Sequence, residues 1–203
     1  ETFTKRDFKY SFIFKDLFKK SNLRSLFSTI GYAEELILLV FWPIFMMVVI
    51  ESYEKIGILS GISSLIMLVA TLYIGKICDR RDRKIVLRLS SIFYALTWIV
   101  KVFARATMSI FVFDTFAKTA KSGVDVSMRS IVYEGGRKNY RSSQSASDNS
   151  IMERCINYEA GLVLGKIFAC LVVIIIALLV NPTNQFVYAF IFAAIMSFFY
   201  AFL

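Results

Sequence analysis

Six long apolar segments alternate with short polar or basic stretches along the 203-residue chain. A helix needs about 20 mostly apolar residues to cross the hydrocarbon part of a bilayer, and the segments match that length. Isolated strands would leave backbone groups unpaired in lipid, whereas helices satisfy their own. The pattern therefore predicts an all-α membrane protein with six transmembrane helices, at residues 25–50, 56–77, 85–104, 108–133, 157–180 and 185–203.

The polar stretches between these segments differ in basic residues. Residues 1–24, the loop between the second and third segments and the loop between the fourth and fifth together hold seventeen Lys and Arg. The opposite side holds only Lys55 and Arg105. Because Lys and Arg stay on the cytoplasmic side of a membrane, both ends of this chain and the two basic loops are expected in the cytoplasm. The net charge of +9 is then a topology signal, and nucleic acid is not an expected partner.

Residues 1–24 are expected to form a cytoplasmic linker, and residues 25–203 a transmembrane bundle. Within the linker, apolar residues between Phe8 and Phe18 recur near helical spacing, with lysines on the other flank. An amphipathic helix lying along the membrane surface fits this pattern. A plain flexible linker is the alternative. The chain opens at Glu1 without a signal peptide, so we expect further residues upstream.

The composition narrows the chemistry. Hydrophobic residues make up 57% of the chain, which is more than in soluble domains, and charged residues make up 19%, which is less. There is no histidine, and the three cysteines have no metal-ligand spacing. No Gly-rich phosphate loop is present either. We therefore expect no metal, no cofactor and no enzymatic activity, and any proton coupling would depend on Asp and Glu.

The loop between the second and third segments carries a motif. It contains Gly75, Asp79, Arg80, Arg83 and Lys84, in the order Gly, three residues, Asp, Arg, two residues and two basic residues. This motif resembles the signature loop of the major facilitator superfamily, which occurs between the second and third helices of each six-helix half. Asp82 stands where that family usually has a second glycine, which places the tight turn in question. A short positively charged topology loop is the alternative interpretation.

The resemblance covers most of the chain and implies the carboxy-terminal half of a twelve-helix transporter. The partner would be the missing amino-terminal half or a second copy of this chain. Gly75 would allow two helices to approach closely, and Asp79 would form a conformational latch with a basic residue, with Arg129 favoured. No internal sequence repeat is evident within the six segments.

Five ionisable residues interrupt the fourth segment: Asp114, Lys118, Lys121, Asp125 and Arg129. At about 100° per residue they fall within a stripe of roughly 80°. A charge facing lipid costs at least a few kcal/mol. The stripe is therefore expected to face the bundle interior or a partner half.

Other charges lie in the first and fifth segments. Glu34 and Glu35 are adjacent in the first, so only one can face a given cavity squarely. Glu159 and Lys166 share a face of the fifth. By the resemblance, the first, fourth and fifth helices line the transport cavity, to which Glu34, Lys118, Lys121 and Glu159 would contribute. The predicted cavity residues are Glu34, Asp114, Lys118, Lys121, Asp125, Glu159 and Lys166.

Two interpretations of these charges stay open. They either form internal salt bridges that fix helix packing or line a cavity for a small polar or charged solute. The function expected from the resemblance is secondary transport by alternating access. The alternative is a membrane receptor or assembly subunit that keeps the fold without transporting. Trp42–Pro43 predicts a helix irregularity in the first segment, because proline removes a backbone hydrogen bond, and Gly161 and Gly165 predict close helix packing in the fifth.

Overall fold

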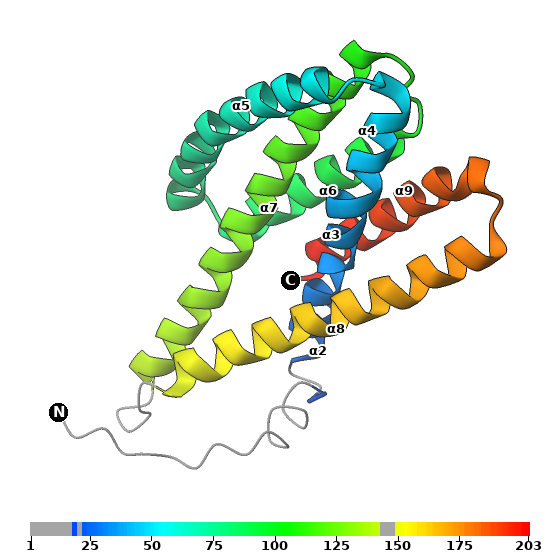
Figure 1. Ribbon diagram of the computed structural model, residues 1–203. Helices are drawn as coiled ribbons and strands as arrows, with labels where there is room; N and C mark the ends of the chain where they lie inside the picture. Colours follow the sequence, from blue (N-terminus) through cyan, green and yellow to red (C-terminus); the bar gives the residue numbers. More distant parts are fainter. Residues whose placement is uncertain (1–17, 20–21, 143–148) are drawn as a thin grey trace.

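The computed structural model describes residues 18–19, 22–142 and 149–203 (Figure 1), and every regular element within them is a helix. The expected amphipathic helix of the linker lies outside these residues, apart from Phe18 and Lys19. After the first helical segment come five long helices. These are α5 (Tyr53–Arg80), α6 (Arg83–Lys101), α7 (Thr107–Ser142), α8 (Asn149–Leu179) and α9 (Pro182–Phe199), which ends in a short 3₁₀ turn, η3 (Tyr200–Phe202).

The first helical segment changes its hydrogen-bonding pattern along its length. It consists of α2 (Leu23–Ile30), the 3₁₀ turn η1 (Gly31–Ala33), α3 (Glu34–Leu36), the π-helical turn η2 (Ile37–Phe41) and α4 (Trp42–Ile50). The π-helical turn lies directly before Pro43, which has no N–H to donate back along the helix. The predicted irregularity at Trp42–Pro43 is therefore present as a local change of helix type.

The helix boundaries differ from the expected ones mainly on the side with the basic loops. Helix α7 continues nine residues past residue 133, and α8 begins eight residues before residue 157. Apolarity marks where a helix can lie in lipid, but it does not mark where the helix ends. Largely polar residues extend both helices beyond their apolar parts, although Gly135 and Gly136 of α7 have low helix propensity.

Four helical stretches are long and apolar enough to cross a membrane: Leu23–Ile50, Tyr53–Arg80, Cys155–Leu179 and Asn184–Phe202. Large apolar side chains are exposed along them, most of all on α5 and α8. Such a surface is unsuited to water and suited to lipid. The expectation of an all-helical protein is confirmed, and these four stretches are consistent with an integral membrane protein. Helices α6 and α7 fall short of the same criterion because charged residues interrupt them.

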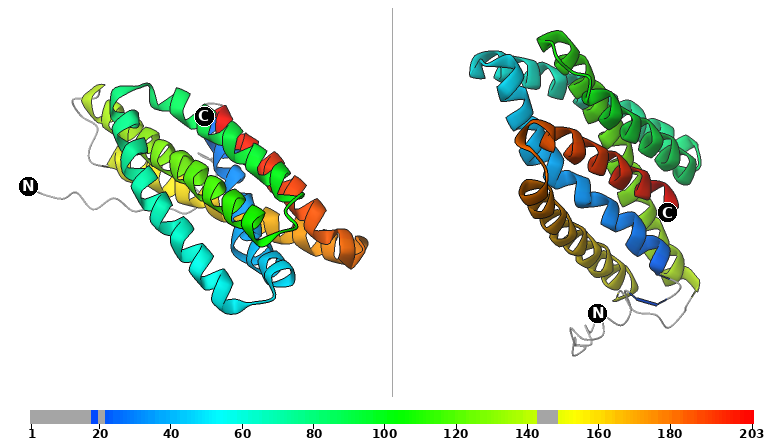
Figure 2. Two further views of the ribbon diagram at one scale, coloured as in Figure 1. Left: turned by 90° about the horizontal axis from the view of Figure 1, so that it is seen from above. Right: turned by 90° about the vertical axis from the view of Figure 1, so that its right-hand side faces the viewer.

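Successive helices reverse direction, and the packing follows a two-fold pattern (Figures 1 and 2). The first segment packs against α8 and α9, while α7 packs against α5 and α6, and α6 packs against α9. If residues 23–101 and 107–202 are taken as two groups of three helices, each first helix contacts the second and third helices of the other group. The sequence showed no repeat because the repeat is one of arrangement and not of residues.

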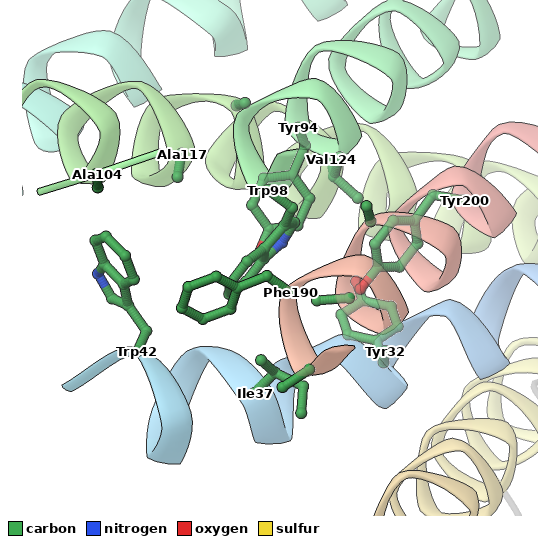
Figure 3. Packing of buried hydrophobic residues seen from close by; sticks show 14 of the residues in the cluster. Tyr32, Ile37, Trp42, Tyr94, Trp98, Ala104, Ala117, Val124, Phe190 and Tyr200 are labelled. Carbon is green, nitrogen blue, oxygen red and sulfur yellow. The ribbon is translucent and has the colours of Figure 1, made fainter. Parts of the chain in front are cut away.

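The core is aromatic and lies where the first segment, α6 and α9 meet. Trp42, Trp98 and Phe190 are buried, and the ring of Phe190 contacts both tryptophans, with Tyr94 beside Trp98 (Figure 3). This cluster holds the first segment against α6 and α9. It also positions Trp42, whose indole N–H enters the polar interior described next.

Candidate functional site

Most of the charged stripe of α7 faces inward: Asp114 and Lys121 are buried, whereas Arg129 at its end is exposed. The centre of the stripe is Lys121, whose Nζ lies 2.6 Å from Glu34 Oε1 of α3. Tyr94 donates to the other carboxylate oxygen at 2.6 Å, and Tyr200 donates to Oε1 at 2.9 Å. The Glu34 side chain is completely buried. A buried carboxylate with three donors, one of them cationic, is well satisfied.

Aromatic rings surround the ammonium group of Lys121. Its Nζ lies 4.3 Å from the ring centroid of Tyr32 and 4.9 Å from that of Tyr200, and both rings are visible in Figure 3. The hydroxyl of Tyr200 also accepts a hydrogen bond from Nζ at 2.9 Å. These contacts compensate the lysine for the loss of water. The side chain is consequently held in one position between α3 and η3.

A second buried carboxylate, Asp114, lies one and a half to two turns away along α7. It accepts hydrogen bonds from Trp42 Nε1 and Ser63 Oγ, both at 2.8 Å, and pairs with Lys118 at 2.8 Å. Lys118 in turn donates to oxygens of Ser60, Ser63 and Ser64 at 2.9–3.3 Å. The sequence analysis passed over these serines. Their spacing of three and four residues on an otherwise apolar helix was the available signal.

Asp125 lies between the interior and the surface of the bundle. Its Oδ1 accepts from the Tyr32 hydroxyl at 3.1 Å and lies 3.6 Å from Lys121 Nζ. Tyr158 of α8 donates to the Tyr32 hydroxyl at 2.9 Å, so a chain of hydroxyls links α8 to the stripe. About a third of the Asp125 side chain is exposed.

A cavity of about 300 Å³ opens along this face of α7. Its lining combines apolar side chains with hydroxyls and with most of the charged stripe: Leu38, Met67, Thr71, Ala117, Lys118, Lys121, Ser122, Asp125, Val126 and Arg129. Asp114 and Glu34 are buried behind the lysines that they pair with and are not part of the lining. The sequence analysis assigned Arg129 to the latch, and the structure places it in the cavity wall.

The two predicted cavity residues of α8 do not line this cavity. Glu159 is exposed, and Lys166 pairs with Glu35 at 2.9 Å. Glu34 and Glu35 therefore point to different partners, as their adjacency required. The expectation that Glu159 and Lys166 join the stripe of α7 finds no support in this arrangement, because the face of α8 that carries Lys166 meets α3.

The turn with the signature-like motif is built without a second glycine. Asp82 has φ −62° and ψ 117° and caps α6 by accepting the Lys84 N–H at 2.9 Å. An aspartate suits this position, because a helix N-cap needs an acceptor side chain and extended backbone, not a left-handed one. The turn between α5 and α6 therefore forms with aspartate at this position.

The motif was expected to allow a close helix approach at Gly75 and to form a latch at Asp79. An added Cβ at Gly75 would meet nothing within 4 Å, so no described helix of this chain makes the expected close approach at Gly75. Among the described residues Asp79 has no ion pair, whereas Arg83 pairs with Glu134 at 2.8 Å and thereby connects α6 to α7. The Asp79–Arg129 latch stays a prediction. The residues Arg80 and Lys84 are exposed.

Lys101 is a buried charge that the sequence analysis did not single out. Its Nζ has no hydrogen-bond partner among the described residues and lies 3.9 Å and 4.1 Å from the ring centroids of Trp42 and Trp98. Two aromatic faces thus replace the usual acceptors of an ammonium group. In the described part of the chain, no group of three His, Cys, Asp or Glu side chains is arranged to hold a metal ion.

The geometry brings together residues from α3, α5, α7 and η3 into one polar interior, with a cavity on one side of it. The arrangement can hold charge at membrane depth. Comparison of the chain with protein-family models and with curated proteins finds no match. Its function is therefore argued from these residues alone.

Proposed function

We propose that this chain is one six-helix half of a transporter of the major facilitator type, which moves a small polar or charged solute by alternating access. The cavity along α7 is the observation that carries the proposal. Lys118, Lys121, Asp125 and Arg129 line it, on a bundle whose outer surface is largely apolar. Ionisable groups at membrane depth are costly and mark solute or ion paths.

Six spans follow if α6 and α7 also cross the membrane. The charges of α7 that would face lipid are instead directed to Glu34, Ser60 and Ser63. Those of α6 lie near its ends, with Arg83 at one end and the buried Lys101 at the other. Their cost in lipid is thus largely avoided, which supports two further spans.

The packing order gives separate support. Two groups of three helices with equivalent contacts and opposite directions are what inverted-topology repeats produce, and such repeats occur within each half of major facilitator transporters. In such folds the solute site lies near the midplane, between two six-helix halves. Here α5, α7 and the π-helical turn form one wall of the cavity. The opposite wall would come from the amino-terminal half or from a second copy.

The transport proposal predicts that residues 1–203 alone catalyse no saturable flux, because they supply one wall of the cavity. The complete polypeptide that contains this chain is expected to transport at least one solute of a polar panel with saturation. Both preparations would be reconstituted in liposomes and assayed for uptake. Saturable flux by the isolated 203 residues would contradict the need for an amino-terminal half and would leave a second copy of this chain as the opposite wall. No flux by either preparation would contradict transport.

The membrane orientation gives a further prediction. In a variant without the natural cysteines, Arg105→Cys is expected to react with a membrane-impermeant thiol reagent in intact cells. Arg81→Cys is expected to react only after permeabilisation, because basic loops stay in the cytoplasm. Both arginines are exposed on the protein surface, so a difference in labelling would report the side of the membrane and not burial within the protein. The reverse labelling pattern would overturn the orientation.

A non-transporting receptor or assembly subunit is the second candidate. One observation favours it: Lys118 and Lys121 are already paired with protein carboxylates and hydroxyls, as structural ion pairs are. A cavity of this kind would be static. Solute binding without flux, measured on the complete polypeptide, would select this candidate over transport.

A further inference from the structure

The three basic side chains of the cavity differ in what they already bind. Lys118 Nζ lies 2.8 Å from Asp114 and within 3.3 Å of oxygens of three serines. Lys121 Nζ bonds to Glu34 and Tyr200 and lies near Asp125. An ammonium group has three N–H donors. Lys118 therefore has no donor left for a solute, and Lys121 has at most one, beside Asp125.

Arg129 is the exception. It is exposed and lines the cavity, and among the described residues its guanidinium has no hydrogen-bond or ion-pair partner. A guanidinium carries five N–H groups in a planar fork that matches the two oxygens of a carboxylate or phosphate. The unused hydrogen-bonding capacity of the cavity is thus cationic.

Asp125 is the single acidic residue among the described residues of the cavity lining. Its carboxylate already accepts from Tyr32 and lies beside Lys121. A cationic solute would have to compete with Lys121 for this carboxylate while facing Lys118 and Arg129. The acids Glu34 and Asp114 cannot help, because both are buried behind the lysines. The lining therefore disfavours a cation.

We propose that the solute carries an oxyanion, a carboxylate or phosphate, which the guanidinium of Arg129 binds. The inference rests on the proposed transport function and deepens it by naming the substrate class. The cavity of about 300 Å³ accommodates a small organic acid. Binding of the oxyanion supplies the partner that the Arg129 guanidinium lacks among the described residues.

The test uses matched probes on the complete polypeptide. Lactate, succinate, benzoate and glycerol 3-phosphate are compared with lactamide, succinamide, benzamide and glycerol, and with benzylamine as a cation. Binding is measured by calorimetry in detergent and flux in proteoliposomes. At least one anion is expected to bind while its neutral counterpart and the amine do not. Whether the carboxylates or the phosphate ester respond separates the two sources of the oxyanion.

Arg129→Gln is expected to raise the Kd and KM for that anion about 10–100-fold, since charge-assisted hydrogen bonds are lost. Arg129→Lys keeps the charge but loses the planar fork, so an intermediate rise is expected. Arg105→Gln removes the same charge away from the cavity and should leave both constants unchanged. If Arg129 acted only through an Asp79 latch, Asp79→Asn and Arg129→Gln would lower kcat alike and leave Kd unaltered, which would overturn the proposal.

The outcomes separate this inference from transport itself. Saturable flux of a neutral or cationic probe, unaffected by Arg129→Gln, would sustain transport and refute the oxyanion site. Anion binding that depends on Arg129, without flux, would sustain the oxyanion site and refute transport. If no anion bound, the proposed substrate class would be wrong whatever the flux of other probes.

Discussion

Lys121→Met is expected to lower the free energy of unfolding by about 3–5 kcal/mol, the range seen when one partner of a buried ion pair is removed. The methionine fills the space, but the Glu34 carboxylate stays completely buried and loses the ammonium group that lay 2.6 Å away. The hydroxyls of Tyr94 and Tyr200 cannot replace that charge. Reversible unfolding in mixed micelles would measure the change.

Two variants control for this result. Lys166→Met removes a lysine whose side chain is 53% exposed and paired with Glu35, so a loss below about 1 kcal/mol is expected. Glu34→Gln combined with Lys121→Met removes both charges and keeps an acceptor for one tyrosine hydroxyl and a donor for the other. This double variant should regain more than half of the lost stability. Equal losses for Lys121→Met and Lys166→Met would mean that the buried pair has no special role.

Gly161→Val is expected to destabilise the bundle by about 1–3 kcal/mol through overpacking. Even a single added Cβ would lie 2.2 Å from Thr29 Oγ1 and 2.9 Å from Thr29 Cβ. Thr29 is buried and donates to the Leu26 carbonyl at 2.9 Å, so its side chain cannot move without losing that bond. Helix α8 must separate from α2 instead. Unfolding of the purified variant measures the cost.

Gly57→Val is the matched control, because nothing lies within 4 Å of a Cβ added at Gly57. Its effect should stay within about 0.5 kcal/mol, as for exposed positions. Thr29→Gly in the Gly161→Val background should restore part of the stability by removing the clashing atoms. A Gly161→Val loss no larger than that of Gly57→Val would show that α8 does not pack against α2 in this way.

Part of the site could be predicted from the sequence because a charged side chain at membrane depth must face the protein interior or water. The stripe of α7 had to face inward, since each charge in lipid costs a few kcal/mol. That rule needs only helical spacing and depth, both readable from residues 108–133. The same reasoning correctly separated Glu34 from Glu35, which point about 100° apart on one helix.

The partners of these charges were not readable. Glu34 bonds to Lys121 of α7 and Glu35 to Lys166 of α8, although the sequence suggested that Lys166 would share the cavity with Glu159. The choice depends on how α3 is rotated between α7 and α8. Rotation about a helix axis is set by the packing of residues distant in the chain, so no local pattern encodes it.

Glycine illustrates the same division. Gly161 and Gly165 were predicted to allow close packing, and added Cβ atoms there would lie 2.2 Å from Thr29 and 3.1 Å from the Ile30 carbonyl. Close packing was equally expected at Gly75 of the motif, yet no atom lies within 4 Å of a Cβ added there. The small size of glycine allows another helix to approach closely, but whether a helix lies there depends on the tertiary packing.

The sequence by itself determined the helical membrane class, the approximate helix positions and the inward stripe of α7, since these depend on hydropathy and on helical periodicity. The tertiary structure alone decided that two lysines of the cavity pair with buried carboxylates and that Arg129 has no ion-pair partner among the described residues. It also decided that Lys101 lies between Trp42 and Trp98. The hydrogen-bond partners of each charged side chain come from several helices, α3, α5, α6 and α7. The relative positions of these helices are fixed only when they pack.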